Sequence, residues 1–444
     1  MRYERIIQAS IFDLFADHQM GRELRAMSQW LDGQGDLVKW VAADLCSKVV
    51  KETGRCGLPA EAVLRCGLLK QYRQLSYEEL AFHLEDSSSF RAFARLPLSL
   101  RPQKSVLQKT ISAVRAGTWE KINQAVLASA LQRRIETGAR IRIDSTVTDA
   151  LMHAPTDSSL LVDAVRVMGR LLQEAATLPG GQALSWRDHR RLARKRALAI
   201  QYSRGKHRKA ALYRDLIAAT QAMVAAVQRA DLCLTPSPDA QLWRCQAEHY
   251  LPLVERVIAQ TKRRVIDGEA VPVAEKLVSL FEPHADIIVK GGRDVQYGHK
   301  LNITSGRSGL ILDVVIEQGN PADTACFGIM LDRHMALYTK PPRQAAADGG
   351  YASNDNLRRA KDLGIEDMAF HKKCGLKIED MVKSRWVYRK LRNFRAGIEG
   401  NISCLKRAYG LSRCTWRGLD HFRSYVWSSI VAYNLALFAR LSSA

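Results

Sequence analysis

The sequence is short of acidic residues and has no long apolar run. Its 444 residues hold 45 Asp and Glu against 67 Lys and Arg, a formal net charge of +22. No apolar signal core follows the opening MRYERIIQAS, and the most apolar tail stretch, SSIVAYNLALFARL, is too short to span a bilayer. These absences argue against a membrane protein. The excess of positive charge predicts a polyanionic partner, with nucleic acid first.

Paired cysteine motifs and repeats are also absent. The nine cysteines are scattered without any Cys-x-x-Cys, which argues against a disulfide framework and favours reduced thiols in a cytoplasm. We find no internal repeat and no long low-complexity tract. A content of 47% hydrophobic residues is typical of globular chains with a real core, and the length predicts two to four domains.

Residues 1–135 are predicted to be helical. Ser76 and Glu79 have the spacing of a capping box, and Ser105 and Gln108 repeat that spacing. Two short helices around the polar turn DSSS fit a helix-turn-helix and fit a plain helical bundle equally well. Both interpretations stay open.

A strand and a long basic segment follow. In residues 136–154, the stretch ARIRIDSTVT alternates apolar and polar residues with the period of a strand, and Asp144 lies at its end. Residues 155–288 are predicted to be a helical insertion whose centre holds ten Lys and Arg against one Asp, too skewed for a salt-bridged surface. We therefore predict contacts with a phosphate backbone. The residues predicted to make them are Arg190, Arg191, Arg194, Lys195, Arg196, Arg204, Lys206, Arg208 and Lys209.

Residues 289–425 are predicted to form a β-hairpin and then alternating helices and strands, and residues 426–444 a C-terminal helix. Asp348 ends a short apolar strand, directly before Gly349 and Gly350, which force a turn. Trp386 lies among lysines and arginines, an arrangement that allows stacking on unpaired bases.

The last predicted helix of this region holds a single acid among cations. In LRNFRAGIEGNISCLKRAYG, apolar residues recur at helical spacing, and Arg392, Arg395, Glu399 and Lys406 form a second stripe beside them. The glycines on either side of Glu399 each weaken a helix by about 1 kcal/mol relative to alanine. Close approach of the helix to the sheet, or of DNA to the helix, explains them.

Three acids, Asp144, Asp348 and Glu399, fit one chemical demand. Cutting a phosphodiester requires cations that activate the attacking oxygen and stabilise the leaving one, and Mg²⁺ is held for this by a few carboxylates. Each acid alone also has an ordinary interpretation, as a turn former or as part of a surface salt-bridge network. Asp149 is the rival candidate for the first position.

Several segments resemble one family. RIDSTVTDA, YGHKLNITSGRSGLILDVVIEQGNPAD, ADGGYAS and RAGIEGNISCLKRAYGLSR are similar to segments of bacterial insertion-sequence transposases with a DDE domain, in the insertion-sequence-five-like or ISNCY-like group. The signature of that group is Tyr, two residues, Arg, three residues, Glu, six residues, Lys. Arg395, Glu399 and Lys406 are in register with it, whereas Arg392 stands at the tyrosine position.

The resemblance implies a fold and an activity. The fold is an α/β, RNase H-like mixed five-stranded sheet flanked by helices, with an all-α N-terminal domain for DNA binding or dimerisation and a helical insertion after the first core strand. Asp144, Asp348 and Glu399 would be both catalytic and metal-binding, with two Mg²⁺ ions per active site and Mn²⁺ able to substitute. Lys300, Arg392, Arg395 and Lys406 would contact DNA.

The implied protein binds the terminal inverted repeats of its element as double-stranded DNA, cuts there, and joins the ends to target DNA. It would act as a homodimer or larger assembly, associated with the nucleoid in the cytoplasm. Two alternatives stay open. One is a non-cutting repressor or architectural protein of the same descent, and the other is a nuclease without strand transfer.

Overall fold

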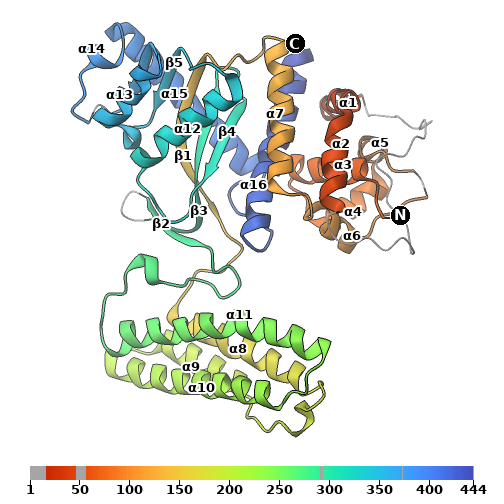
Figure 1. Ribbon diagram of the computed structural model, residues 1–444, viewed down its shortest axis with the longest axis vertical. Helices are drawn as coiled ribbons and strands as arrows, with labels where there is room; N and C mark the ends of the chain where they lie inside the picture. Colours follow the sequence, from red (N-terminus) through yellow and green to blue (C-terminus); the bar gives the residue numbers. More distant parts are fainter. Residues whose placement is uncertain (1–16, 47–56, 98, 291–293, 373, 444) are drawn as a thin grey trace. The chain divides into compact units, whose positions relative to one another are not determined.

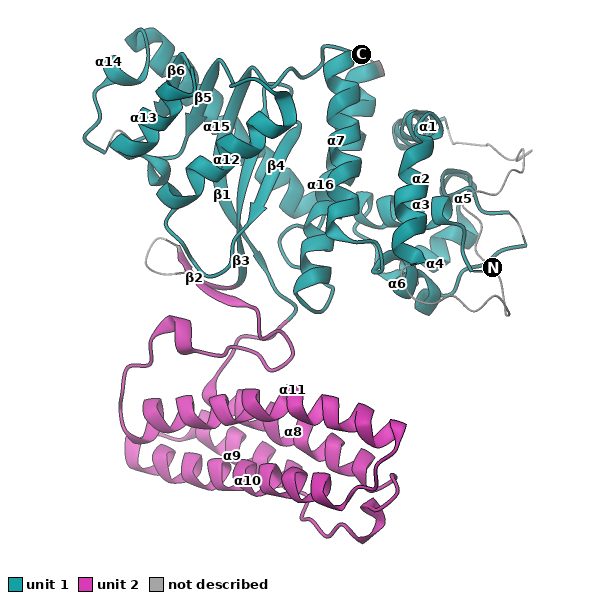
Figure 2. Ribbon diagram, viewed as in Figure 1, with its two compact units in different colours: residues 1–151, 298–444 teal, residues 152–297 magenta. Residues whose placement is uncertain are grey.

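The computed structural model describes residues 17–46, 57–97, 99–290, 294–372 and 374–443. The chain divides into two compact units (Figure 2). The first unit comprises residues 1–151 and 298–444, and the second comprises residues 152–297. None of the described helices is long and apolar enough to cross a membrane.

A mixed sheet organises the fold, as predicted (Figure 1). Its strand order is β2-β3-β1-β5-β6, and β4 pairs with β3. Strand β1 is parallel to β5 and antiparallel to β3, β5 is parallel to β6, and β3 is antiparallel to β4. The strands are β1 (Arg140–Asp149), β2 (Asp286–Lys290), β3 (Asp294–Gly306), β4 (Ile311–Ile316), β5 (Gln344–Ala347) and β6 (Asp367–Phe370).

The predicted number of five strands was wrong, because the described residues form a six-stranded sheet. The additional strand is β2. The sequence analysis predicted no strand there, and β2 spans the end of the predicted helical insertion and the two residues after it. Its Ile-Ile-Val run is β-branched and suits a strand, but a run this short carries no clear period.

Strand register brings two of the predicted acids together. Ile143 of β1 pairs in parallel with Ala347 of β5. The next residues along these two strands are Asp144 and Asp348. Because parallel neighbours lie about 4.8 Å apart, the two acids are adjacent at the same end of the sheet.

Helix α15 (Arg385–Ala408) packs against β1, β5 and β6, whereas α12 (Asp323–Tyr338) packs against β4. Arg142 and Asp144 point to the same face of β1 because side chains alternate along a strand, and both contact α15. The other helices that follow the sheet's central strands are α13 (Asn354–Asp362), α14 (Ile378–Met381) and α16 (Leu419–Ser443).

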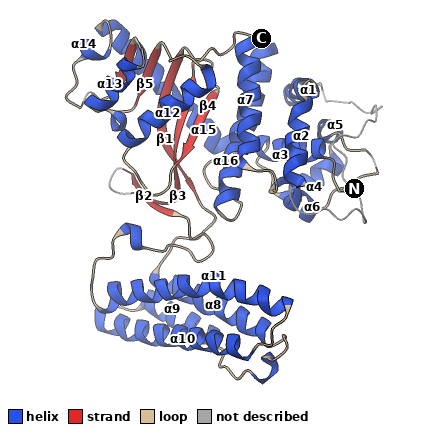
Figure 3. Cartoon of the chain, in the orientation of Figure 1, coloured by secondary structure: helices blue, strands red, loops and turns tan. Residues whose placement is uncertain are grey.

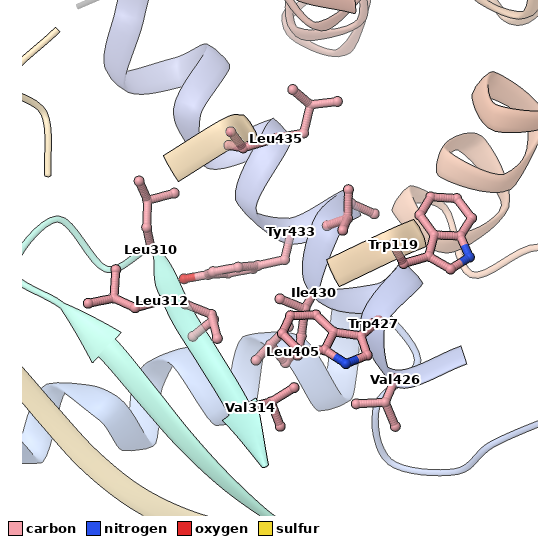
Figure 4. Close-up of a cluster of buried hydrophobic side chains, with 14 of the residues drawn as sticks. Trp119, Leu310, Leu312, Val314, Leu405, Val426, Trp427, Ile430, Tyr433 and Leu435 are labelled. Atoms are coloured by element: carbon pink, nitrogen blue, oxygen red, sulfur yellow. The ribbon is translucent and has the colours of Figure 1, made fainter. Parts of the chain in front are cut away.

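The described residues before β1 form helices, as predicted. Helix α7 packs along α16, and α3 also contacts α16. Figure 4 shows Trp119 of α7 and Trp427 of α16 in the shared apolar cluster, where both rings are buried. These helices are α1 (Gln19–Asp32), α2 (Gly35–Leu45), α3 (Ala60–Tyr72), α4 (Tyr77–Asp86), α5 (Ser88–Ala94), α6 (Lys104–Ile111) and α7 (Ala116–Gln132).

The second unit is mainly helical (Figure 3). It has its own apolar core. Trp243 is buried there and donates a 2.7 Å hydrogen bond from Nε1 to the carbonyl of Leu171, which joins two of its helices. The helices predicted for this segment are therefore present, whereas its predicted domain limits stay predictions. They are α8 (Asp157–Ala175), α9 (Arg190–Tyr202), α10 (Lys206–Cys233) and α11 (Pro238–Thr261).

Candidate active site

Asp144 is held in a fixed position at the centre of the sheet. Its residue is 9% exposed, and its Oδ1 accepts a 2.8 Å hydrogen bond from the backbone N–H of Ser145. The opposite neighbour on β3 is Ile303, which is fully buried. A carboxylate so enclosed by strands has little freedom to change its rotamer, so its second oxygen keeps one direction.

Asp348 lies where β5 gives way to a tight turn. A Cβ on Gly349 would come within 2.7 Å of the Lys372 Cβ, and one on Gly350 within 2.5 Å of a carboxylate oxygen of Asp323. The two glycines are therefore required by the close packing of neighbouring segments rather than by positive φ angles. The Asp348 side chain keeps 40% of its surface exposed, which leaves it accessible to a substrate.

Glu399 is carried by α15, whose start is fixed by a side-chain cap. The hydroxyl of Ser384 accepts a 3.3 Å hydrogen bond from the backbone N–H of Val387. Leu391, Ile398 and Leu405 form the buried stripe of the helix. Glu399 lies beside this stripe with 65% of its side chain exposed.

Arg395 joins the three acids. Its Nη2 lies 2.6 Å from Oδ2 of Asp144 and 3.4 Å from Oδ1 of Asp348, and its Nη1 lies 2.8 Å from Oε1 of Glu399. The arginine itself is only 7% exposed. The three acids, far apart in the sequence, therefore converge on one guanidinium, as a shared site requires.

The three carboxylates suit a hard cation as ligands, although the Arg395 guanidinium contacts all of them in this structure. Within the described parts of the chain, no three His, Cys, Asp or Glu residues form a ready-made metal cluster. Mg²⁺ does not need one, because it is usually held by one or two carboxylates together with substrate phosphates and water. The Asp144 and Asp348 oxygens both contact the same nitrogen, so a small side-chain movement after the guanidinium leaves would let them share an ion.

One of the glycines beside Glu399 has a clear packing reason. A Cβ on Gly397 would lie 2.1 Å from Nη1 of Arg142, so α15 approaches the sheet closely there. A Cβ on Gly400 would meet nothing within 4 Å. Close approach to the sheet thus accounts for Gly397 and not for Gly400.

Arg142 is a buried cation that the sequence prediction did not single out. It donates from Nη1 to the carbonyl of Phe394 at 3.1 Å and from Nη2 to Oδ1 of Asn401 at 2.6 Å, and its guanidinium lies 4.9 Å from the Phe394 ring centre. Burial lowers the pKa of this guanidinium, which still stays protonated because arginine begins so high. The only available signal was its position two residues before Asp144, on the same strand face.

Asp149, the rival acid, lies apart from this cluster. It is five residues beyond Asp144, about 16 Å along the strand. Burial raises the pKa of its carboxyl, and the nearby charges of Lys406 and Arg413 oppose that rise. Lys406, predicted to contact DNA, is thus close to Asp149.

The other residues predicted near the site differ in accessibility. Arg392 is exposed, with its guanidinium 5.8 Å from the ring centre of Tyr388. Trp386 is 63% exposed, and the Lys390 ammonium lies 4.8 Å from its ring centre. Lys300 is instead 6% exposed, and its ammonium pairs with Asp323 at 2.5 Å. Lys300 therefore has a partner within the chain, and its contact with DNA stays a prediction.

The basic residues of the second unit lie on α9, on the start of α10 and in the turn between them. Two are engaged with acids: Arg190 pairs with Asp188 at 2.7 Å, and Arg196 pairs with Asp215 at 3.0 Å. The remaining members of the predicted set are exposed to solvent. They are Arg191, Arg194, Lys195, Arg204, Lys206, Arg208 and Lys209.

Comparison with protein families gives two matches. Residues 259–435 match the family model described as "Transposase DDE domain", and residues 12–115 match "Transposase domain (DUF772)". The first match includes Asp348 and Glu399. It does not include Asp144, because most of the second unit lies between Asp144 and the start of the match. No curated protein and no solved structure matches the chain significantly. Together the two matches indicate that the chain is an insertion-sequence transposase with a DDE domain.

Proposed function

We propose that the protein cuts DNA at the ends of its own element through a triad of Asp144, Asp348 and Glu399. The observation that carries this proposal is the convergence of all three carboxylates on the guanidinium of Arg395. Asp144 lies within β1, Asp348 follows the end of the parallel strand β5, and Glu399 comes from a helix packed on both, an arrangement that supports an RNase H-like core.

The three carboxylates would hold two Mg²⁺ ions, with Mn²⁺ able to replace them. Bound there, the ions would lower the pKa of the attacking water or hydroxyl and stabilise the leaving oxygen. The chain itself orients the substrate. Arg395, once released by the acids, and the exposed Arg392 would bind phosphates on either side of the scissile bond. Water attacks first and frees a 3′-hydroxyl, and that hydroxyl then attacks target DNA in the same site.

The net charge of +22 supports double-stranded DNA as the partner. We assign the terminal inverted repeats to the N-terminal helices and to the exposed cations of the second unit. Because two ends must be joined to one target, a homodimer or larger assembly follows. Assignment to the insertion-sequence-five-like or ISNCY-like group, and work beside the nucleoid in a bacterial cytoplasm, belong to the same proposal.

The test is a cleavage assay on DNA that carries the ends of the element. Asp144→Asn, Asp348→Asn and Glu399→Gln should each lower Mg²⁺-dependent cleavage by at least about 10³-fold, because each removes a charged metal ligand. DNA binding, measured by gel shift, should persist in all three. Asp149→Asn is the matched control and should keep wild-type cleavage.

Retained cleavage in any triad variant would disprove the assignment of that acid. The reaction products separate the remaining possibilities. Joined target DNA identifies strand transfer, cut ends alone identify a nuclease, and binding without cutting by the wild-type chain identifies a non-catalytic DNA-binding protein.

A further inference from the structure

Arg142 is buried without a carboxylate partner, which is unusual for an arginine. Its residue is 8% exposed, and no ion pair joins it to an acid anywhere in the described ranges. Its hydrogen bonds go to neutral groups: the Ser305 hydroxyl at 3.3 Å, the Phe394 carbonyl and the Asn401 side chain. The charge of Glu136 opposes the lowering of the Arg142 pKa by burial, but no carboxylate among the described residues lies within ion-pair distance of the guanidinium, and a buried cation with neutral hydrogen-bond partners is costly.

The two contacts with α15 bracket the functional turn of that helix. Phe394 and Asn401 are seven residues apart, close to two helical turns or about 10 Å along the axis. Arg395 and Glu399 lie between them. A single planar guanidinium held at both points therefore fixes the axial position and the rotation of this turn relative to β1.

The same contact reaches two further elements. The Asn401 amide nitrogen donates to the carbonyl of Gly309 at 3.0 Å and lies 2.6 Å from the Tyr433 hydroxyl. Gly309 lies in the turn between β3 and β4, and Tyr433 lies on α16. Asn401 is thus itself held in place, so the guanidinium of Arg142 contacts a rigid partner.

We propose that Arg142 is a positioning residue for the carboxylate site, acting through Phe394 and Asn401 to hold Glu399 at the distance from Asp144 that a pair of divalent cations requires. This inference rests on the proposed function. Gly397 belongs to the same arrangement, because a Cβ at this position would lie 2.1 Å from Nη1 of Arg142 and would force the guanidinium to leave its hydrogen-bonded position.

Two glycines of the same helix provide a matched test. Gly397→Ala places a methyl group against the guanidinium, whereas Gly400→Ala places one in open space. Both changes raise helix propensity equally. We expect Gly397→Ala to cut element-end DNA about 10²-fold more slowly than the wild type at saturating DNA, the effect of displacing a catalytic group by about 1 Å. The DNA concentration for half-maximal rate should not change. Gly400→Ala serves as the control in the DNA-free measurement, where no substrate approaches the helix.

A second readout does not depend on cleavage. Binding of Mn²⁺ to the DNA-free full-length chain, followed by the electron paramagnetic resonance signal of the free ion, should weaken about tenfold in Gly397→Ala and stay unchanged in Gly400→Ala, since misplaced ligands bind a metal less well. Arg142→Lys keeps the charge but loses the planar fork, and should weaken Mn²⁺ binding in the same way. It replaces Gly397→Ala if that variant does not fold.

The combination of variants completes the test. In an Arg142→Gln background the obstruction is reduced, so adding Gly397→Ala should cause little further loss, and the two effects should not add. Equal Mn²⁺ binding by wild type, Gly397→Ala and Arg142→Lys would overturn the inference. A wild-type chain that binds Mn²⁺ but never cuts DNA would overturn the proposed function instead, while the Mn²⁺ comparison would still decide the role of Arg142.

Discussion

Nη2 of Arg395 lies 2.6 Å from Oδ2 of Asp144, the shortest of the three contacts that this arginine makes with the acids of the candidate site. Both side chains are nearly buried, so the pair is shielded from solvent. Arg395 therefore supplies the positive charge that three neighbouring carboxylates need, and any divalent ion that binds there must replace it.

This relationship predicts a metal-dependent stability. Arg395→Gln leaves the three carboxylates without their shared cation, and we expect a loss of roughly 1–3 kcal/mol in the free energy of unfolding in EDTA, reduced from a fully buried case because Glu399 is exposed. Mg²⁺ should restore most of this loss and should stabilise the variant more than the wild type. Thermal melts with and without Mg²⁺ measure both effects.

The exposed Arg392 on the same helix provides the control for that experiment. Arg392→Gln should change stability by no more than about 0.5 kcal/mol in either buffer, because this exposed side chain makes no ion pair with an acid among the described residues. Equal responses of Arg395→Gln and wild type to Mg²⁺ would contradict the competition between arginine and metal.

Local periodicity correctly predicts that a strand ends directly before Asp348 and that α15 has an apolar stripe. The prediction that Asp144 ends its strand was wrong, because β1 continues to Asp149. Asp144 and Asp348 are adjacent because Ile143 pairs with Ala347, and the apolar stripe of α15 orients Glu399 as expected. Their catalytic role stays a prediction. The reach of Arg142 to a carbonyl 252 positions away was not predictable, since no pattern encodes a side-chain contact across that separation.

Capping shows the same limit on a smaller scale. The Ser76 capping box with Glu79 is confirmed, with both reciprocal hydrogen bonds present. The same device at Ser105 was wrong, because α6 already begins at Lys104 and its N-cap, Gln103, makes no side-chain cap bond. Spacing alone does not fix a helix start when packing of Leu107 and Ile111 sets the position of the helix.

We expect the buried His334 to make the free energy of unfolding decrease in acid. It is 2% exposed and stacks on Tyr338, and neither ring nitrogen has a hydrogen-bond partner among the described residues. Burial lowers its pKa to about 4, from 6.5. The unfolded chain therefore binds more protons between these two values, so the stabilising contribution is complete above pH 6.5 and is lost as the pH falls towards 4.

The comparison variant is His334→Phe, which keeps an aromatic ring beside Tyr338. Its stability should fall less than that of the wild type between pH 6.5 and 4, by roughly 3 kcal/mol at most. Denaturant titrations at a series of pH values measure the difference. His249→Phe changes an exposed histidine and should leave the wild-type pH dependence of stability in place. If the stability of His334→Phe falls with pH as much as that of the wild type, the buried His334 imidazole is not the cause of the acid sensitivity.

We expect Trp386 to contribute to DNA binding but not to the stability of the fold. Its indole is 63% exposed and lies near the Lys390 ammonium, so it is available to stack on an unpaired base. Trp386→Ala should weaken binding to DNA with unpaired bases by about 1–3 kcal/mol, and Trp386→Phe should recover much of that loss. If Trp386→Ala and the wild type bind this DNA with equal affinity, the indole does not stack on an unpaired base.

We expect the exposed cations of α9 to contribute to DNA affinity in a way that depends on salt and not on the DNA sequence. Arg191, Arg194 and Lys195 are exposed and make no ion pair with an acid in the described part of the chain. Each phosphate contact that is lost should lower the slope of log K against log salt by about 0.9. The triple change of these residues to glutamine should therefore lower the slope by about 2–3, measured by fluorescence anisotropy on duplex DNA with and without the element ends.

Arg170 of α8 is the control for this experiment, since it is exposed on the same unit but outside the predicted set. Arg170→Gln should keep the wild-type slope. The triple variant should lose affinity for both DNA sequences by the same factor, because phosphate contacts position the protein and carry no base information. An unchanged slope would mean that the basic helix faces solvent in the complex, and the DNA contacts of the protein would then have to come from the N-terminal helices and from the carboxylate site.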